Sequence, residues 1–146
     1  MKRDLAALAQ ATGGVLHGEA AAFGAVTTDT RALEPGALYV ALRGERFDGH
    51  EFVPEARARG AAGALVARAA SVALPQVVVA DVLAGLTAFA SAWRKDFGGT
   101  VVGITGSNGK TTVKEMTGAI LARAGACLVT RGNLNNHIGV PLTLCR

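Results

Sequence analysis

The sequence contains few aromatic residues, few cysteines and no long apolar run. Its 146 residues include five Phe, one Tyr, one Trp and two Cys. Cys127 and Cys145 match no metal-ligand spacing, which disfavours a cysteine metal centre and indicates thiols in a reducing compartment. No apolar run reaches the length of a membrane span. Met1 to Asp4 lead into an amphipathic helix rather than an apolar signal sequence, so we expect a cytoplasmic protein.

Charge of one sign is also not in large excess, although it is unevenly spread. The formal net charge is +4. Residues 1–81 carry eight basic and nine acidic side chains, whereas residues 82–146 carry seven and two. The basic residues are scattered and no aromatic residues lie among them, which argues against nucleic-acid binding. The excess in the second part suits a phosphate-bearing partner, and it would equally arise if acidic neighbours lay further along a longer chain.

Residues 1–80 are predicted to form a small α/β domain. A first helix places Leu5 and Leu8 on its apolar face and ends at Gly13. A second helix is expected from His50 to Arg59, with Phe52 on its apolar face. Short β-branched or apolar runs bounded by turn residues predict strands at 15–16, 26–31, 38–42, 63–67 and 76–79.

A long helix is predicted to follow Asp81, which is placed to cap it. Apolar residues between Val82 and Phe97 recur at helical spacing, and Trp93 lies on that stripe, which indicates a core position. Gly98 ends the helix. We therefore expect a boundary near residue 80, with residues 1–80 forming the first domain and residues 81–146 beginning a second one.

The segment from Val101 to Thr112, V-V-G-I-T-G-S-N-G-K-T-T, predicts a buried strand, a glycine-rich turn and the start of a helix. Such a turn directs backbone N–H groups and the positive end of the helix dipole at one point, where an anion can bind. Gly106 and Gly109 allow the backbone to curl closely around a phosphate. Lys110 adds a full positive charge, and Thr111 is placed to offer its hydroxyl to Mg²⁺.

The motif departs from the usual phosphate loop, because Ile104 stands where the first glycine of G-x-x-x-x-G-K-[ST] is expected. The competing interpretation is an ordinary glycine turn with Lys110 exposed to solvent. A lysine in the first turn of a helix opposes the helix dipole, so it needs a reason to be there. An anion at the loop supplies that reason.

A further strand is predicted at residues 127–129, after the helix that follows Lys110. Strand, helix and strand form a βαβ unit and hence the beginning of a parallel sheet. Two strands and two helices cannot cover both faces of such a sheet. We therefore expect an α/β fold in which a small first domain precedes the beginning of a larger, incomplete phosphate-loop domain.

Three separated motifs resemble the Mur ligases, the cytoplasmic enzymes that build the peptide of the peptidoglycan precursor. The first is T-G-S-N-G-K-T-T with the V-V-G-I segment before it, which resembles their ATP loop. The second includes Asp29-Thr30-Arg31, Leu38-Tyr39-Val40-Ala41 and Asp48-Gly49 of the first domain. The third is R-G-N-L-N-N-H-I-G-V-P-L-T-L, residues 131–144, which resembles the branch of the family that adds a dipeptide.

The resemblance implies an ATP- and Mg²⁺-dependent ligase acting on UDP-N-acetylmuramoyl-tripeptide and D-alanyl-D-alanine, with an acyl phosphate as intermediate. It implies a role for each of fifteen residues. The ATP-binding residues are Gly106, Ser107, Asn108, Gly109, Lys110, Thr111 and Thr112, with Lys110 catalytic and Thr111 on the metal. The substrate-binding residues are Thr30, Arg31, Glu45, Arg46 and Phe47 at the uridine end, and Asn133, Asn135 and Asn136 at the sugar and peptide.

Several alternatives stay open from the sequence. Thr30 is also explained as a turn residue, Arg31 as a partner of Asp29, and the asparagines as loop-stabilising residues. His17 and His50 are expected at the surface without a partner, and His137 in solvent or in a structural role. The protein is expected to be a monomer. Because the family's second metal ligand, modified lysine and acceptor domain match nothing in residues 1–146, this chain alone is expected to be inactive.

Two other functions compete with the dipeptide-adding ligase. One is the sister enzyme that adds the third amino acid of the peptide. The other is a non-catalytic nucleotide-binding fragment, which would retain the loop and would bind Mg-ATP without ligase activity. The acceptor required for phosphate release distinguishes the dipeptide-adding ligase from its sister enzyme. Ligase activity at native length distinguishes both enzymes from the non-catalytic fragment.

Overall fold

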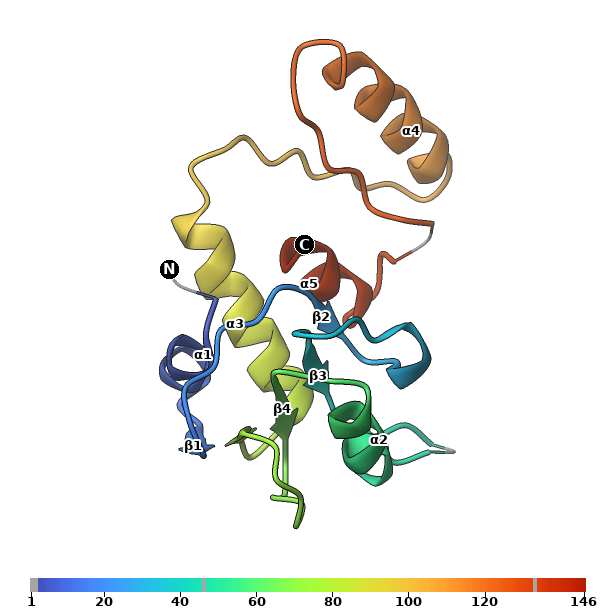
Figure 1. Cartoon of the computed structure of the whole chain (residues 1–146). Coiled ribbons are helices and arrows are strands. Elements are labelled where there is room, and N and C mark those ends of the chain that lie inside the picture. The colour runs from blue at the N-terminus through green and yellow to red at the C-terminus, as the bar shows by residue number, and fades with distance from the viewer. Residues whose placement is uncertain (1–2, 46, 133) are drawn as a thin grey trace.

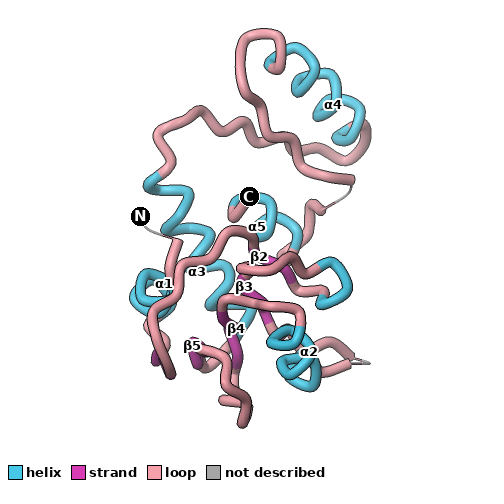
Figure 2. The backbone as a smooth tube through the Cα atoms, viewed as in Figure 1, coloured by secondary structure: helices cyan, strands magenta, loops and turns pink. Residues whose placement is uncertain are grey.

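The computed structural model describes residues 3–45, 47–132 and 134–146. A five-stranded sheet dominates the first part of the chain, with helices on both of its faces (Figures 1 and 2). Its spatial order is β1-β5-β4-β3-β2. The strands are β1 (Val15–His17), β2 (Val26–Thr27), β3 (Leu38–Val40), β4 (Gly63–Val66) and β5 (Gln76–Val78). The α/β class predicted from the sequence is confirmed.

Four of the five strands run parallel. β2, β3, β4 and β5 pair in parallel, and β1 pairs antiparallel with β5 at one edge. Every residue of β3 and β4 is buried. Continuous burial is typical of strands that are covered on both faces by helices, and it explains why these two strands are almost entirely apolar.

The helices are of two kinds, short 3₁₀ segments and α-helices. One 3₁₀ segment follows β2 and the other precedes the second α-helix, and the last three α-helices follow the sheet in sequence. The elements are α1 (Leu5–Thr12), η1 (Thr30–Ala32), η2 (Gly49–Phe52), α2 (Val53–Ala58), α3 (Val82–Asp96), α4 (Lys110–Leu121) and α5 (Gly139–Leu144).

The sheet separates two hydrophobic cores. Leu38 and Val40 of β3 join a core built with α1, α3 and the end of α5. Tyr39, which lies between them, joins the other core together with Val53 of α2. Neighbouring residues of a strand point to opposite faces, so this alternation places α2 on one face and α1 and α3 on the other.

Side-chain caps fix the beginnings of the two long helices of this unit. Asp4 accepts a hydrogen bond from the Ala7 N–H at 2.8 Å, and Asp81 accepts one from the Ala84 N–H at 2.8 Å. Each cap of this kind stabilises its helix by about 1 kcal/mol. Gly13, with a φ of +65°, ends α1 in the left-handed conformation.

α3 packs against α1, β4 and α5. Phe89 is fully buried in it, with its ring centroid 5.7 Å from that of Phe23 and 6.4 Å from that of Trp93. Trp93 stacks on Phe89 but is only half-buried, so it lies at the margin of the core rather than at the core position predicted for it. The division between residues 80 and 81 stays a prediction.

α5 brings the end of the described chain back to its beginning. Cys145, just after α5, is buried in the same core as α1 and α3. Arg3 donates a hydrogen bond to the Cys145 carbonyl oxygen, and its guanidinium carbon lies 4.9 Å from the centroid of the Trp93 ring. Burial lowers the pKa of Arg3, and the charge of Cys145 partly opposes that shift.

Two strand predictions in the second part are wrong. Residues 101–104 and 127–129 form no strand in the structure. A strand is held by the ladder of hydrogen bonds to a neighbouring strand, and no described residue pairs with either segment in that way. The sequence correctly indicates their apolar character, but the pairing depends on neighbours that a local pattern does not contain.

Phe52 also departs from its expected position on the buried face of a helix. The helix between His50 and Arg59 is divided into η2 and α2, and Phe52 at the junction is 40% exposed. No helix within the described residues is both long and apolar enough to cross a membrane.

Candidate functional site

The glycine-rich loop leads directly into α4, as the sequence predicts. Gly109 stands at the N-cap with a φ of +75°, and Gly106 has a φ of +148°. No atom lies within 4 Å of an added Cβ at Gly109, so its requirement for glycine is conformational rather than steric. The first N–H groups of α4 have no acceptor within the helix and remain available to an anion.

Lys110 folds back over this loop. Its Nζ donates to the Gly106 carbonyl oxygen at 2.6 Å and approaches the Ser107 carbonyl oxygen at 3.5 Å. The ammonium is therefore held against the backbone of the loop that leads into α4. This arrangement gathers positive charge and donors at one point, which is what phosphate binding requires.

The remaining residues of the motif are exposed around the same turn. Ser107, Asn108, Thr111 and Thr112 are all solvent-accessible. A hydroxyl is a hard oxygen ligand of the type that Mg²⁺ prefers, and this metal keeps several ligands from water and phosphate, so one hydroxyl from Thr111 fits its chemistry. Within the described part of the chain, no cluster of three His, Cys, Asp or Glu residues could hold a metal by itself.

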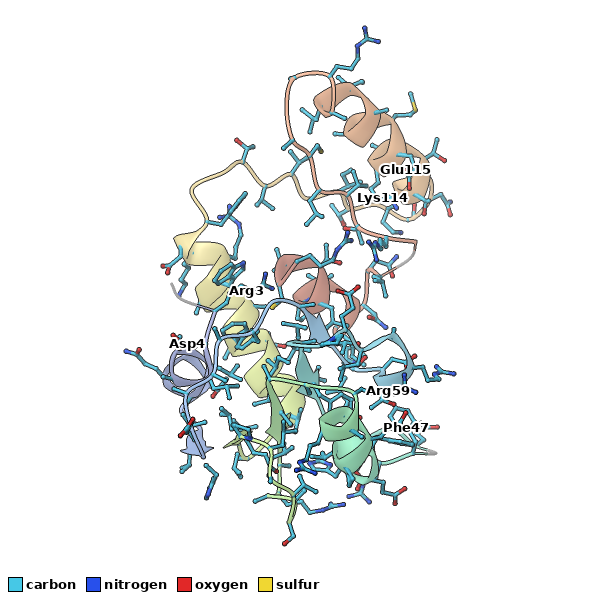
Figure 3. The ribbon with its side chains drawn as sticks, viewed as in Figure 1. Arg3, Asp4, Phe47, Arg59, Lys114 and Glu115 are labelled. Carbon is cyan, nitrogen blue, oxygen red and sulfur yellow. The ribbon has the colours of Figure 1, made fainter. Side chains whose placement is uncertain are left out.

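Lys114 connects α4 to the tail. Its Nζ donates to the carbonyl oxygens of Thr130 at 2.8 Å and Gly132 at 3.1 Å, and it also lies 2.9 Å from a carboxylate oxygen of Glu115 (Figure 3). The same helix that begins at the loop thus holds the segment leading to the asparagines. Sequence reasoning missed Lys114. Its position one turn after Lys110, on the same side of the helix, is the signal that was available.

The asparagines of the tail divide into different roles. Asn136 accepts hydrogen bonds from the N–H groups of Ile138 at 3.2 Å and Gly139 at 2.7 Å, and so caps the start of α5. Asn135 is exposed, and Asn133 lies outside the described residues. For Asn136 the structural role of a loop-stabilising residue is therefore present, whatever else the side chain contacts.

Thr30 and Arg31 form the first turn of η1, directly after β2. Thr30 is 6% exposed, and Asp29 caps the segment through the Arg31 N–H at 2.9 Å. The Arg31 guanidinium holds both carboxylate oxygens of Asp29, at 2.9 Å and 2.7 Å. Hydrogen bonding from this side chain lowers the pKa of Asp29, and the same bond raises the pKa of Arg31. The partnership with Asp29 that the sequence left open is present.

The loop after β3 carries the other first-domain residues. Glu45 is exposed and Phe47 is 57% exposed, whereas Arg46 lies outside the described residues. β2 and β3 are parallel neighbours, so the segments that follow them leave the sheet at the same end, the carboxyl end of the strands. Ligands of open α/β sheets bind outside the carboxyl ends of the strands, and these segments lie at such a position.

His50 lies in this region and corrects the expectation of an unpartnered surface histidine. It is 9% exposed, its Nδ1 lies 2.6 Å from Asp48 Oδ1, and its Nε2 accepts the Ala67 N–H at 2.8 Å. Asp48 also accepts from the Arg68 guanidinium at 2.7 Å. Hydrogen bonds from the His50 backbone and then from Arg68 hold the pKa of Asp48 well below its usual range.

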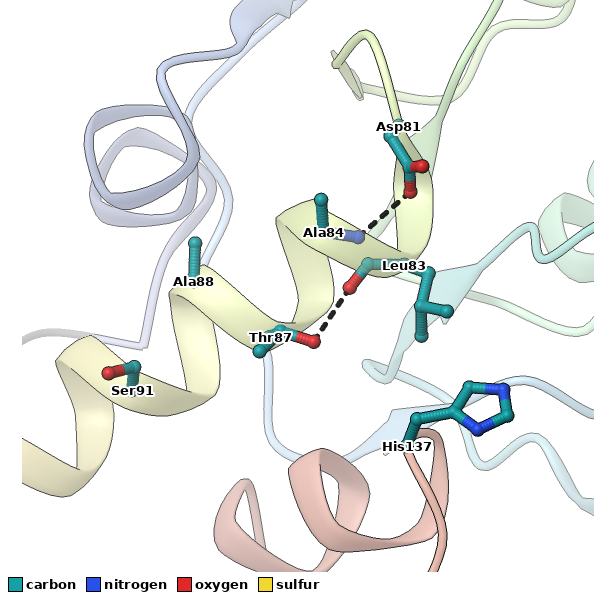
Figure 4. Close-up of a pocket in the computed structure, with 7 residues that line it drawn as sticks. All are labelled: Asp81, Leu83, Ala84, Thr87, Ala88, Ser91 and His137. Carbon is teal, nitrogen blue, oxygen red and sulfur yellow. Dashed lines mark hydrogen bonds between the residues drawn. The ribbon is translucent and has the colours of Figure 1, made fainter.

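An open groove runs along one side of α3. Figure 4 shows its lining, in which Asp81 caps the helix and the Thr87 hydroxyl donates to the Leu83 carbonyl oxygen at 2.9 Å. His137 from the tail faces the groove from the opposite side, and it is exposed. The other lining residues, Ala84, Ala88 and Ser91, are small, and they supply little chemistry to this surface.

The fold and the loop together define a class, that of α/β proteins with a glycine-rich phosphate-loop motif at the start of a helix. The sequence matches the Mur ligase family catalytic domain over residues 23–95 and the Mur ligase middle domain over residues 104–146. The first match covers half of the 146 residues. The chain belongs to the Mur ligase family.

The chain is also similar to curated proteins that share one name. The chain is 50% identical over 142 residues to the UDP-N-acetylmuramoyl-tripeptide--D-alanyl-D-alanine ligase of Escherichia coli K12, covering 97% of this chain and 31% of that protein. It is 45% identical over 135 residues to the enzyme of the same name from Bacillus subtilis 168, covering 89% and 28%. The chain therefore spans less than a third of the length of these relatives.

Solved structures agree with the sequence matches. A crystal structure of MurF from Acinetobacter baumannii superposes with a TM-score of 0.88 at 39% identity, covering 99% of this chain and 33% of that one. MurF ligase from Thermotoga maritima, solved in complex with ADP, gives a TM-score of 0.72 at 34% identity, covering 83% and 28%.

Proposed function

We propose that this chain is part of an ATP-dependent ligase that joins D-alanyl-D-alanine to UDP-N-acetylmuramoyl-tripeptide in the synthesis of the peptidoglycan precursor. The observation that carries the proposal is the loop from Gly106 to Thr112 at the start of α4, with Lys110 folded over it. Its setting, a chain 50% identical to a ligase of that name, supports the choice of reaction.

Residues 106–112 are proposed to hold the phosphates of ATP. The N–H groups of the loop and of the first turn of α4 would bind the phosphate oxygens, and Lys110 would exchange its carbonyl partners for them. Thr111 would hold Mg²⁺, which supplies charge neutralisation for phosphoryl transfer. Transfer of a phosphoryl group depends mainly on positioning and charge stabilisation, and these are what the loop offers.

In the proposed reaction, a carboxylate oxygen of the tripeptide takes the γ-phosphoryl group of ATP, so an acyl phosphate forms and ADP leaves. The amine of D-alanyl-D-alanine then attacks the acyl carbon, an amide bond forms, and inorganic phosphate leaves. Within this chain, Lys110 would stabilise the charge that develops on the transferred group. Positive donors fixed before the reaction stabilise such charge without the cost of reorganising solvent.

The UDP-linked substrate is proposed to lie along the carboxyl edge of the first sheet. Thr30, Arg31, Glu45, Arg46 and Phe47 would meet its uridine end. The tail, with Asn133, Asn135 and Asn136, would face the sugar and peptide. We further propose that residues 1–80 form the domain for this substrate and residues 81–146 begin the ATP domain, in a monomeric cytoplasmic enzyme.

The test is phosphate release by the full-length gene product with ATP, UDP-N-acetylmuramoyl-tripeptide and D-alanyl-D-alanine. Lys110→Ala is expected to reduce turnover by at least about 10²–10³-fold, the effect of losing one preorganised charge-stabilising group. Lys95→Ala is the matched control, since Lys95 is an exposed lysine in the last turn of α3. Equal turnover in wild type and Lys110→Ala would contradict the role given to the loop.

The acceptor in the same assay separates the neighbouring reactions. Release that depends on D-alanyl-D-alanine supports the proposal. Release that depends instead on lysine or a diamino acid, with a UDP-linked dipeptide substrate, would identify the sister ligase. ATP binding without release under either condition would identify a non-catalytic nucleotide-binding protein.

A further inference from the structure

The loop that carries Glu45 and Phe47 is fastened at its base. Residues Arg43 and Asp48 form an isolated antiparallel bridge, and the Gly44 N–H donates to the Phe47 carbonyl oxygen at 2.9 Å. The Phe47 ring lies directly over Gly44, where an added Cβ would come within 2.6 Å of a ring carbon. The loop is thus closed at its base, while Glu45 and Phe47 are exposed to solvent.

Asp48 holds the end of this turn to two other elements. Its Oδ1 accepts the His50 N–H at 3.0 Å and lies 2.6 Å from His50 Nδ1, and its Oδ2 accepts from Arg68 at 2.7 Å. Arg68 follows β4, so the carboxylate connects the segment after β3 with the segment after β4. The carboxylate of Asp48 thus contacts both His50 and Arg68.

His50 is itself fixed at both ring nitrogens. Because Nε2 accepts the Ala67 N–H at 2.8 Å, the ring proton belongs on Nδ1, where it is donated to Asp48. The side chain is 7% exposed. Both nitrogens are occupied by the fold, so His50 supports the loop and does not transfer protons or bind metal in this arrangement.

The backbone beside His50 is equally constrained. The Tyr39 hydroxyl donates to the Gly49 carbonyl oxygen at 2.9 Å, and the Gly49 N–H donates to the Leu42 carbonyl oxygen at 2.8 Å. A Cβ on Gly49 would lie 2.5 Å from that same oxygen, so only glycine fits there. The anchor of the loop is therefore built from buried groups of β3 and of the residues that follow it, while Glu45 and Phe47 are exposed.

We propose that Asp48, together with Arg68, is a positioning pair that holds the base of the loop between Arg43 and Asp48 in the position required to bind the uridine end of the UDP-linked substrate. This inference rests on the proposed function. Asp48 is 18% exposed at its side chain and spends both carboxylate oxygens on protein partners, so it acts through the loop and does not contact substrate. Arg68, at 62% exposure, closes the pair from the solvent side.

The test uses steady-state kinetics of the full-length protein with Asp48→Asn. The amide nitrogen of Asn cannot accept a hydrogen bond, so this variant keeps the size of the side chain and loses one of its two hydrogen-bond-accepting oxygens. We expect the KM for UDP-N-acetylmuramoyl-tripeptide to rise about tenfold, a difference of about 1.4 kcal/mol. The KM for ATP and the kcat are expected to stay within about twofold, as for a loss of uniform binding that is equal in the ground state and the transition state.

Two further variants make the test specific. Arg68→Met removes the same hydrogen bond from the other side, and its effect on the KM should not add to that of Asp48→Asn, because both remove one interaction. Asp4→Asn is the matched control, since Asp4 also caps a helix through its carboxylate but lies at the start of α1. It should leave all kinetic constants unchanged.

Each outcome decides between the inference and its alternatives. An unchanged KM for the UDP-linked substrate in both Asp48→Asn and Arg68→Met overturns the inference. A lower kcat, together with a similar rise in the KM for ATP and in the KM for the UDP-linked substrate and with a lower Tm, also overturns it, because this pattern would show a merely structural role. If wild type neither binds nor turns over the UDP-linked substrate, the proposed function itself is wrong and the inference falls with it.

Discussion

The first unit, residues 3–96, and the following segment, residues 97–132, differ in how far their apolar side chains are buried. In the first unit, side chains such as Tyr39, Leu65 and Phe89 are at most 2% exposed. In the second, the apolar stripe of α4 is left in solvent, with Met116 60% and Ile120 67% exposed. The only buried residue of α4 is Gly118.

The difference shows which structures can form from local interactions. α4 closes its own backbone hydrogen bonds and begins at a glycine N-cap, so its regular structure needs no pairing with a neighbouring element. A strand has no internal hydrogen bonds and needs a neighbour. The segments at 101–104 and 127–129 therefore remain irregular, while the sheet of the first unit is complete.

Two apolar truncations in the 146-residue chain should differ strongly in their cost to stability. Phe89→Ala should lower the free energy of unfolding by about 3–5 kcal/mol, because it removes a buried ring from between two others. Met116→Ala should change it by no more than about 0.5 kcal/mol, since the side chain is exposed. Urea titration followed by circular dichroism measures both. A loss for Met116→Ala comparable with that for Phe89→Ala would mean that α4 belongs to a packed core.

Much of the first unit could be predicted because its signals are local. Gly13 and Asp81 mark helix ends by their own backbone or side-chain chemistry, and the structure confirms both. The glycine loop is likewise a local signal, and α4 begins at Lys110 as expected. The strands at 101–104 and 127–129 could not be judged in this way, because their state depends on pairing across the sheet.

The candidate site was predictable to the extent that its residues follow one another in sequence. Gly106 and Lys110 are four residues apart and meet through a direct hydrogen bond. Asp48 and Arg68 are twenty residues apart and meet only because β3 and β4 are neighbours in the sheet. His50 was expected at the surface for the same reason, since its partner Ala67 is distant in sequence.

The two cysteines lie in the two different environments. Cys145 packs in the core of the first unit, where burial raises its pKa to about 11 while Arg3 partly opposes the shift. A shift of two units from 9.0 leaves about a hundredfold less thiolate than in an ordinary cysteine at pH 8. Cys127 is exposed. A thiol-reactive chromophore should therefore modify one thiol rapidly and the second only after denaturation.

The Cys127→Ser variant is the control, since it should abolish the rapid phase and leave the slow one unchanged. Its remaining thiol should become more reactive as the pH approaches 11, because a raised pKa is overcome only when the solution reaches it. Two thiols with equal rates in the native protein would show that α5 does not pack against α3 in solution.

The smallest effect comes from a pair of glycines in equivalent conformations. Gly13 and Gly109 have φ values of +65° and +75°, and nothing lies within 4 Å of an added Cβ at either position. Alanine should therefore cost about 1–2 kcal/mol at each site through backbone strain alone. Because α1 is packed and α4 is not, Gly13→Ala should lower the urea midpoint of the whole first unit, whereas Gly109→Ala should leave that midpoint unchanged.

The cost at Gly109 should instead appear locally, as faster amide hydrogen exchange along α4, because a helix without packed neighbours opens independently of the core. Exchange measured by mass spectrometry on peptides covering residues 110–121 tests this directly, with peptides of α1 as the internal reference. If Gly109→Ala lowers the urea midpoint as much as Gly13→Ala does, the two regions unfold together. The exposed stripe of α4 would then be stabilised by contacts with the first unit in solution, and the contrast between a packed region and a locally stabilised one would not hold.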